Sequence, residues 1–442
     1  MRWLYTQLLR LALPVLALQL AWRGFTERDY WRGFGARLGL GRAAAGGVDA
    51  WVHAASVGEV QVAIALIRAW QARRAGLSVA LTCMTPAGLA RARQALGDTV
   101  VLRYAPYDLP GGVRRTLARL SPRLLVVVET ELWPNLLHGC LAAGVPVLMA
   151  SARVSVRTAA RLARLPSLLR APLARNTWVM AQTAADAARL QGLGVPAARC
   201  EVAGNIKFDQ PVGAGVHAHG QALRAQYAAT RPLWVAGSTH PDEEVQVLEA
   251  HRRVRQHLPQ ALLVLAPRHR PRFEPVAALL RREGFDAAYR TRPEAADAAA
   301  PVLLLDTIGE LVDFYAAADV AFVGGSLVPI GGHNLLEPAA LGVPVLSGPA
   351  QFNSPEAARL LAGAGGLATV ADAAELAQAV TALLSDPQRA RQQGEAGAAV
   401  VAANGGALDR VLRLADALVD GGGRAGAQPA AGDAAGAGAG AG

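Results

Sequence analysis

The chain has 442 residues, enough for two or three domains, and 52% of them are hydrophobic, which is ample for full cores. The net charge of +10 favours anionic partners. The arginines are dispersed, however, and only 5% of residues are aromatic, which argues against nucleic acid. Cys83, Cys140 and Cys200 are odd in number and far apart, which argues against a disulfide framework and against structural zinc.

An apolar stretch and a basic flank open the chain. Residues 3–22 are mostly apolar, with Trp3 and Trp22 near the ends, where an interfacial aromatic belt would place them. The uncharged part, residues 11–22, is too short to cross the roughly 30 Å hydrocarbon layer alone. The stretch therefore either spans with Arg10 snorkelling or lies along the interface, while a cleaved signal peptide is the less favoured alternative. The flank carries arginine at positions 23, 28, 32, 37 and 42.

We expect this basic flank to touch lipid phosphates and to hold the downstream chain in the cytoplasm. A plain solvated face is the alternative interpretation of the same arginines.

Strand-like and helix-like segments then alternate in two series. Short apolar runs of the first series occupy residues 50–54, 79–82, 124–128, 145–150 and 178–181. Those of the second occupy residues 233–236, 262–266, 302–305, 320–323 and 343–346. Helical spacing follows the runs, as in residues 60–70 and 86–96, so each series predicts a parallel sheet covered by helices.

The alternation therefore predicts an α/β protein with two doubly wound, Rossmann-like domains facing a cleft. The expected division is an anchor at 1–22, a first domain at 23–209, a linker at 210–230, a second domain at 231–420 and a disordered Gly/Ala tail at 421–442. No GxGxxG follows the first strand and no P-loop sequence occurs, so neither a dinucleotide site nor a P-loop is supported.

A single lysine stands among 44 basic residues. Lys207 lies in the sequence Gly-Asn-Ile-Lys-Phe-Asp, and the other 43 are arginine. A compact ammonium in a tight site cannot be replaced by a planar guanidinium, so Lys207 is a candidate to meet an anionic substrate group. A chance survivor on a solvated surface remains the alternative.

Two acidic segments follow strands of the first series. Ser56 and Glu59 fit a capping box at a helix start, which accounts for them structurally, and Glu59 is also placed to act as a general base. Glu129 and Glu131 follow a very apolar strand, where acids are costly unless they are paired or functional. A carboxylate at this position could face Lys207, and a surface turn is the alternative.

The second series carries basic and glycine-rich loops. Arg268 follows a strand within Pro-Arg-His-Arg, which suits a nucleotide phosphate, although a solvated basic turn is a fair alternative. Two glycine pairs, at 324–325 and 331–332, precede a helix start near His333, so we expect backbone amides there to hold phosphate. Glu337 is placed to accept hydrogen bonds from ribose hydroxyls.

Together the segments resemble one family, the 3-deoxy-D-manno-octulosonic acid (Kdo) transferases of lipopolysaccharide synthesis. HAASVGE, MTPAG, YDLP, ETELWPN, SARVSVRT, GNIKFD, PRH, FVGGS and GGHNLLEP occur in the family's order, up to about residue 415. The resemblance implies the GT-B fold, in which the second domain mainly holds the donor nucleotide. It implies CMP-Kdo as donor and a tetraacylated lipid A precursor as acceptor, at the cytoplasmic face of the inner membrane.

The resemblance also implies site residues. Glu59 matches the general base, and Glu129 and Lys207 match residues that stabilise the transition state. The matched CMP-binding positions are Pro267, Arg268, Ile308, Gly309, Glu310, Asn334, Leu335, Leu336 and Glu337. Leu335 stands where proline is frequent and Ser151 where asparagine is frequent, which weakens the detail of the donor contacts.

The implied reaction is an inverting transfer that requires no metal and no cofactor, and no DxD pair occurs at a suitable strand end. Two alternatives remain open from the residues. One is another GT-B transferase that acts on a membrane lipid, and the other is a membrane-associated nucleotide-binding protein without catalytic activity. The number of Kdo units transferred cannot be read from the sequence.

Overall fold

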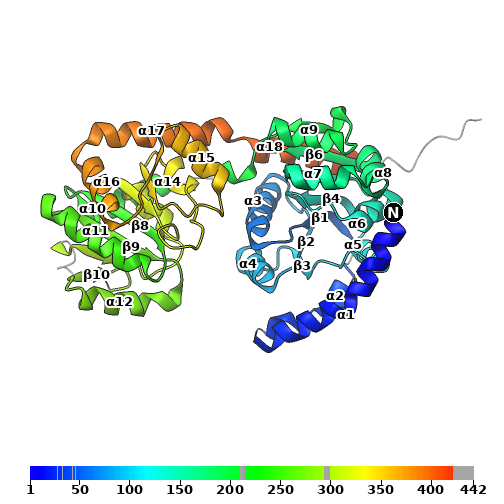
Figure 1. Cartoon of the computed structure of the whole chain (residues 1–442), viewed down its shortest axis with the longest axis horizontal. Coiled ribbons are helices and arrows are strands. Elements are labelled where there is room, and N and C mark those ends of the chain that lie inside the picture. The colour runs from blue at the N-terminus through cyan, green and yellow to red at the C-terminus, as the bar shows by residue number, and fades with distance from the viewer. Residues whose placement is uncertain are drawn as a thin grey trace, which may run out of the picture. The chain divides into compact units, whose positions relative to one another are not determined.

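A computed structural model describes residues 1–421 apart from positions 27, 32, 42, 45, 210–212, 214 and 293–298. The chain divides into two compact units (Figure 1). Unit 1 comprises Met1–Lys207 and the C-terminal segment from Gly406, and unit 2 comprises Phe208–Gly405. The expected Gly/Ala tail lies outside the described residues, except for Gly421.

Unit 1 is a seven-stranded parallel sheet in the order β3-β2-β1-β4-β5-β6-β7. Its strands are β1 (Val48–His53), β2 (Val79–Cys83), β3 (Val101–Tyr104), β4 (Pro122–Val128), β5 (Val147–Ala152), β6 (Thr177–Ala181) and β7 (Cys200–Val202). Its helices are α1 (Arg2–Thr26), α2 (Phe34–Arg37), α3 (Val57–Arg73), α4 (Pro86–Leu96), α5 (Pro110–Leu120), α6 (Pro134–Ala143), α7 (Val156–Ala163), α8 (Pro166–Asn176), α9 (Ala184–Gly192) and α18 (Ala407–Gly421).

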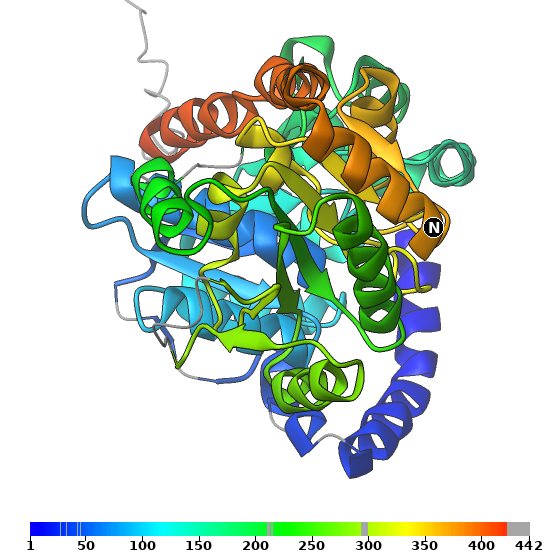
Figure 2. The same ribbon diagram turned by 90° about the vertical axis from the view of Figure 1, so that its left-hand side faces the viewer.

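Unit 2 repeats this plan with a seven-stranded parallel sheet in the order β10-β11-β9-β8-β12-β13-β14. Its strands are β8 (Leu233–Thr239), β9 (Leu262–Pro267), β10 (Ala287–Tyr289), β11 (Val302–Leu304), β12 (Val320–Val323), β13 (Val345–Ser347) and β14 (Leu367–Thr369). Its helices are α10 (Val216–Ala228), α11 (Glu243–His257), α12 (Phe273–Arg282), α13 (Leu311–Ala317), α14 (Leu336–Ala340), α15 (Pro355–Gly363), α16 (Ala373–Ser385) and α17 (Pro387–Asn404). Helices cover both faces of its strands (Figure 2).

Both sheets match the predicted alternation, because central strands buried on both faces are nearly continuous apolar runs. The four strands without a predicted counterpart, β3, β7, β10 and β14, are three or four residues long and lie at or next to a sheet edge. Strand order reverses between β1 and β4 in unit 1, and between β8 and β12 in unit 2. Ligands of doubly wound sheets bind beyond the strand ends at such switch points.

The end of the chain returns to unit 1, whereas the sequence placed residues up to 420 in the second domain. One face of α18 is buried in the core of unit 1, through Ala407, Val411, Leu412, Ala415 and Val419. The indole of Trp70 donates a 2.7 Å hydrogen bond to Asp416, and Arg74 pairs with Asp420 at 2.8 Å. The domain boundary therefore depends on a contact between residues about 350 positions apart.

The expected linker also differs from the structure, because α10 fills much of residues 210–230 and packs against α13 in unit 2. A Cβ at Gly220 would lie 2.7 Å from the Cβ of Ala316, so the glycine lets the two helices approach closely. A glycine within the expected linker thus serves close helix packing.

Helix α1 continues four residues beyond the expected anchor and is long and apolar enough to cross a membrane. Its first turns are attached to unit 1, since the hydroxyl of Tyr5 donates to Asp108 at 2.9 Å and that of Thr6 lies 3.3 Å from the Asn135 amide oxygen. The large apolar side chains recur every three to four residues on one exposed face: Leu4, Leu8, Leu11, Val15, Leu18, Trp22 and Phe25.

The basic flank is only partly a surface feature. Arg37 is buried, donates a 2.9 Å hydrogen bond to the carbonyl of Met84 and lies over the ring of Tyr104, with the guanidinium carbon 4.2 Å from the ring centroid. The expectation that Arg37 touches lipid phosphates is therefore wrong, because its charge is used inside unit 1. Positions 32 and 42 lie outside the described residues.

Candidate active site

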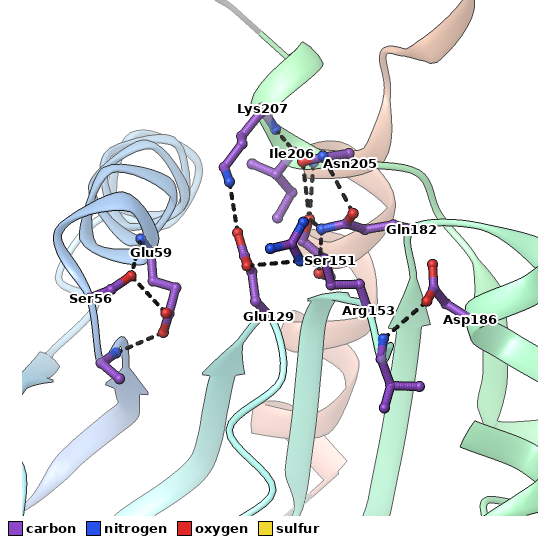
Figure 3. A network of polar contacts seen from close by, with 12 residues as sticks. Ser56, Glu59, Glu129, Ser151, Arg153, Gln182, Asp186, Asn205, Ile206 and Lys207 are labelled. Atoms are coloured by element: carbon purple, nitrogen blue, oxygen red, sulfur yellow. Dashed lines mark hydrogen bonds and ion pairs between the residues drawn. The ribbon is translucent and has the colours of Figure 1, made fainter. Parts of the chain in front are cut away.

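The carboxyl ends of β1 and β4 meet at the switch point of unit 1, and the expected catalytic residues gather there (Figure 3). Glu59 lies in the first turn of α3, which follows β1. Its Oε1 accepts a 2.7 Å hydrogen bond from the Ser56 hydroxyl, and its Oε2 accepts a 2.8 Å bond from the backbone N–H of Ala55. The Ser56 hydroxyl oxygen also accepts a 3.3 Å hydrogen bond from the backbone N–H of Glu59, which caps α3 as predicted. The Glu59 side chain reaches the backbone N–H of Ala55 in place of that of Ser56, and these bonds fix the orientation of a nearly buried carboxylate.

Lys207 and Glu129 form an ion pair, with 2.8 Å between Nζ and Oε1 (Figure 3). The other oxygen of Glu129 lies 3.3 Å from Nε of Arg153. Glu129 is 9% exposed, so one carboxylate meets two cations in a largely desolvated place. The expected contact between an acid after β4 and Lys207 is present.

The backbone beneath this pair is strained. Glu129 and Ser151 have φ values of 59° and 55°, which are uncommon for residues other than glycine. The Ser151 hydroxyl lies 3.3 Å from both the backbone N–H of Ile206 and the side-chain amide of Gln182. Asn205 in turn accepts a 3.0 Å hydrogen bond from the backbone N–H of Lys207. A polar network thus supports the segment that carries the lysine (Figure 3).

Glu131 is a third carboxylate of this group that sequence reasoning did not assign to the site. Burial, followed by the charges of Glu59 and Glu129, raises its pKa to about 7. The indole of Trp133 donates a 2.5 Å hydrogen bond to it. The signal in the sequence was the pair of acids after one buried strand, but only the structure distinguishes the ion-paired Glu129 from Glu131.

A buried histidine lies beneath Trp133. The rings of His53 and Trp133 meet edge to face, with 4.5 Å between their centroids, and Nδ1 of His53 lies 3.0 Å from the Thr82 hydroxyl. Burial lowers the pKa of His53 to about 4, so the imidazole is neutral at pH 7. It supports the indole that holds Glu131.

In unit 2 the expected donor-binding residues lie at the carboxyl ends of neighbouring strands. Pro267 ends β9 and is buried, and the side chain of Arg268 beyond it is exposed.

Ile308, Gly309 and Glu310 follow β11, which pairs with β9. Ile308 and Glu310 line a cavity of about 540 Å³ together with Arg270. Arg290 lies 2.7 Å from Glu310, and its hydrogen bond is the main cause that lowers the pKa of the Glu310 carboxyl group, while burial acts in the opposite direction.

The loop amides at residues 325–327, which follow the first glycine pair, are engaged within unit 2. The fully buried carboxylate of Glu243 accepts hydrogen bonds from the backbone N–H groups of Gly325, Ser326 and Leu327 at 2.7, 3.0 and 3.0 Å, and lies 3.3 Å from that of His240. These amides are occupied by an internal anion, so the expected phosphate site is left to the amides of the helix start beyond His333. A Cβ on Gly324 would lie 2.7 Å from this carboxylate, so a residue with a side chain would clash at this position.

Asn334, Leu335, Leu336 and Glu337 form the start of α14. The side chains of Leu335 and Leu336 are buried, so only their backbone is available to a ligand. Asn334 accepts a 3.1 Å hydrogen bond from the backbone N–H of Leu336 and also hydrogen-bonds to Glu337. Burial raises the pKa of Glu337, and the charge of Arg268 opposes this. Arg268, Asn334 and Glu337 therefore belong to one site in unit 2.

Comparison with known proteins agrees with this geometry. The sequence model of the 3-deoxy-D-manno-octulosonic-acid transferase (kdotransferase) family matches residues 32–210. A protein of Haemophilus influenzae named 3-deoxy-D-manno-octulosonic acid transferase is 39% identical over 365 residues, which cover 82% of this chain and 86% of that protein. One of the same name from Bordetella pertussis is 38% identical over 434 residues, which cover 95% and 99%.

Among solved structures, Acinetobacter baumannii MurG aligns with a TM-score of 0.52 at 16% identity, covering 83% of this chain and 99% of that chain. That likeness concerns the fold alone. The two doubly wound parallel units have the GT-B fold of glycosyltransferases. The identity to the two relatives over most of the chain is decisive for the family. The chain belongs to the Kdo transferases.

Proposed function

We propose that this glycosyltransferase moves Kdo from CMP-Kdo to the primary hydroxyl of a tetraacylated lipid A precursor, with inversion at the anomeric carbon. The relatives' names support Kdo as the transferred sugar. The observation that carries the catalytic part is the Glu129–Lys207 ion pair, because the solitary lysine meets a carboxylate at the switch point where Glu59 is also held.

Glu59 is the general base. Each of its oxygens accepts one hydrogen bond from the loop after β1 and keeps a lone pair for another donor. It takes the proton of the acceptor hydroxyl while the hydroxyl oxygen attacks the anomeric carbon of Kdo. The electrons of the bond between that carbon and the phosphate oxygen leave with CMP from the opposite face, which gives inversion.

Glu129 and Lys207 stabilise the transition state electrostatically. The carboxylate favours the positive charge that develops on the sugar ring, and the ammonium meets the sugar carboxylate or the departing phosphate. Both groups are held in advance by Arg153 and by the segment around Asn205, so little reorganisation is needed during the reaction.

CMP is held by unit 2 through the turn at Ile308–Glu310, through Pro267 and Arg268, and through the segment Asn334–Glu337. Arg268 is a guanidinium with an exposed side chain, which suits a phosphate. Glu337 and Asn334 offer acceptors for the ribose hydroxyls. Leu335 and Leu336 take part through their backbone.

The protein works at the cytoplasmic face of the inner membrane, where α1 contacts the bilayer and the surface of anionic lipids attracts the net positive chain. The exposed apolar face of α1, together with its attachment through Tyr5 and Thr6, favours a helix that lies in the interface. The acyl chains of the acceptor then stay in the bilayer during transfer.

The test is incubation of the full-length protein in detergent with CMP-Kdo and the lipid A precursor, followed by mass spectrometry of the lipid. We expect a mass increase of one or more Kdo units, and no transfer from UDP-sugars. Transfer from a UDP-sugar instead would identify another lipid glycosyltransferase. Complete inertness of the wild type with every donor would favour a nucleotide-binding protein without catalytic activity.

A further inference from the structure

Two histidines meet at the switch point of unit 2. His240 follows β8, and His333 follows the loop after β12, the strand that pairs with β8. Their Nε2 atoms lie 2.8 Å apart, and the two rings are nearly coplanar, with 5° between their planes. At this distance one nitrogen must donate a proton and the other must accept it.

The loop is built to bring these rings together. Gly325 has a φ of 69°, and a Cβ there would lie 2.9 Å from Cδ2 of His333. Glu243 fixes the same loop by accepting three backbone N–H bonds and also approaches the backbone N–H of His240. The contact between the rings therefore depends on a glycine and on a buried carboxylate, which makes it a feature of the fold and not of two mobile side chains.

The shared proton determines where a further proton goes. In the neutral pair one ring carries its proton on Nε2 and the other on Nδ1, and the remaining Nδ1 keeps a lone pair. A proton added to that Nδ1 makes the pair cationic without breaking the hydrogen bond between the rings. Within the described part of the chain, no hydrogen bond involves the Nδ1 atom of either ring. The pair can thus gain a charge while its geometry is kept.

The surroundings keep the free pair neutral. Burial, then the charges of Arg268, His240 and His269, lowers the pKa of His333 to about 4. Burial is also the largest cause that lowers the pKa of His240; Glu243 opposes it, and His269, Arg268 and Arg272 act in the same direction as burial. Burial and the nearby cations together outweigh the carboxylate of Glu243, so the pKa of both histidines is lowered. An anion beside Arg268 would reverse this balance.

We propose that the His240–His333 pair takes up a proton when the phosphate of the donor nucleotide binds beside Arg268. The pair then carries a positive charge next to Arg268 only when the phosphate is present. This inference rests on the proposed nucleotide donor. His240 and Arg268 are close, since the backbone N–H of Arg268 donates to the carbonyl of Thr239 at 3.0 Å. An opposite charge within about 4–6 Å raises a pKa by about 1 to 3, which brings the pair into the range of neutral pH.

The test is isothermal titration calorimetry of CMP into the full-length protein in detergent at pH 6.0, in two buffers that differ in ionisation enthalpy. The wild type should take up about 0.5 proton more per CMP than His240→Gln or His333→Gln, because an amide cannot titrate. The phosphate of CMP titrates in the same range, but it contributes equally to every variant and cancels in the difference. His257→Gln, an exposed histidine at the end of α11, is the matched control and should behave as the wild type.

The outcomes separate the two proposals. If CMP binds and both variants take up as many protons as the wild type, the pair is not the proton acceptor. If CMP does not bind the wild type at all, the proposed donor site itself is overturned. Dialysis against a chelator should leave proton uptake unchanged, and its loss would mean that a metal joins the two nitrogens instead.

A second measurement avoids the variants, in case a substitution unfolds unit 2. After correction for the ionisation of CMP, whose second deprotonation acts in the opposite direction, the wild-type Kd for CMP should rise as the pH increases from 6 to 8. Cytidine, which lacks the phosphate, should bind with no such dependence. An equal pH dependence for both ligands would overturn the proposal.

Discussion

The two units of the same fold differ in the charged groups near their strand ends and in how these groups are paired. In unit 1 the strand ends at the switch point carry the carboxylates Glu59, Glu129 and Glu131, and Lys207 is already paired with Glu129. In unit 2 the ends of β8 and β12, which correspond to β1 and β4, carry the neutral histidine pair, and Arg268 follows the neighbouring strand β9. The buried acid Glu243 accepts hydrogen bonds from loop amides. In unit 1 Glu129 is therefore already paired with a cation, whereas in unit 2 the exposed Arg268 is available to an anionic ligand.

This difference suits the two proposed substrates. A hydroxyl acceptor brings no charge, so the base that deprotonates it must be negative before binding. A nucleotide phosphate is itself charged. Cations that are not already paired offset the hydration free energy that the phosphate loses when it binds. The following variants test each side of the comparison.

The largest expected effect is at Glu59. Glu59→Gln keeps the hydrogen-bonding shape of the capping box but removes the proton acceptor, so kcat for Kdo transfer should fall by about 10²–10⁴-fold. Initial rates measured by mass spectrometry of the lipid check this. Glu395→Gln, on an exposed part of α17, is the control. Full activity of Glu59→Gln would remove the base assignment.

A smaller loss is expected from Lys207→Arg. A guanidinium keeps the charge but cannot replace a compact ammonium 2.8 Å from Glu129, so kcat/KM should fall by about 10²-fold while the protein stays folded. Steady-state kinetics and circular dichroism measure the two quantities. Arg91→Lys exchanges the same two residue types at an exposed position of α4, and it should change neither kcat/KM nor the circular dichroism spectrum. Near-normal turnover of Lys207→Arg would mean that the lysine has no catalytic role.

Glu243→Gln tests the internal anion of unit 2. One carboxylate oxygen becomes an NH₂ group that faces backbone N–H donors, so the free energy of unfolding should fall by about 1–3 kcal/mol. The histidine pair should also lose its geometry, and CMP should bind more weakly. Chemical denaturation and calorimetry measure these effects, with Glu274→Gln, exposed on α12, as the control. An unchanged stability would show that the loop does not depend on this anion.

The smallest effect is a pH dependence from Glu131. Its pKa is raised to about 7 in the folded protein, so the folded state binds the proton more tightly than the unfolded state. The stability from this group is complete below its unfolded pKa of about 4.5 and is lost as the pH rises through 7.

Glu131→Gln removes that dependence. Its Tm relative to the wild type should therefore rise by about 2–4 °C between pH 5 and pH 8. Differential scanning calorimetry at both pH values measures this difference. A constant difference would mean that Glu131 titrates in the same way in the folded and unfolded states.

Much of the architecture follows from local sequence. The central strands are apolar runs that a parallel sheet buries on both faces, so their positions could be predicted without knowing their neighbours. The capping box at Ser56 and Glu59 is similarly local, because its partners are three residues apart. Lys207 could be selected as a candidate site residue from composition alone, because a single lysine beside 43 arginines is unusual.

The tertiary structure decided which groups meet. The Glu129–Lys207 pair joins residues 78 positions apart, the His240–His333 pair residues 93 positions apart, and the Glu243–Gly325 bond residues 82 positions apart. The two contacts in unit 2 depend on strand order, which places β12 beside β8 and not beside β11, the strand before it in the sequence. The burial of Arg37 and the return of α18 to unit 1 are of the same kind, because both depend on what packs against them. The sequence alone thus determined the elements and the motifs after them, and long-range packing determined which charges are already paired and which can receive a ligand.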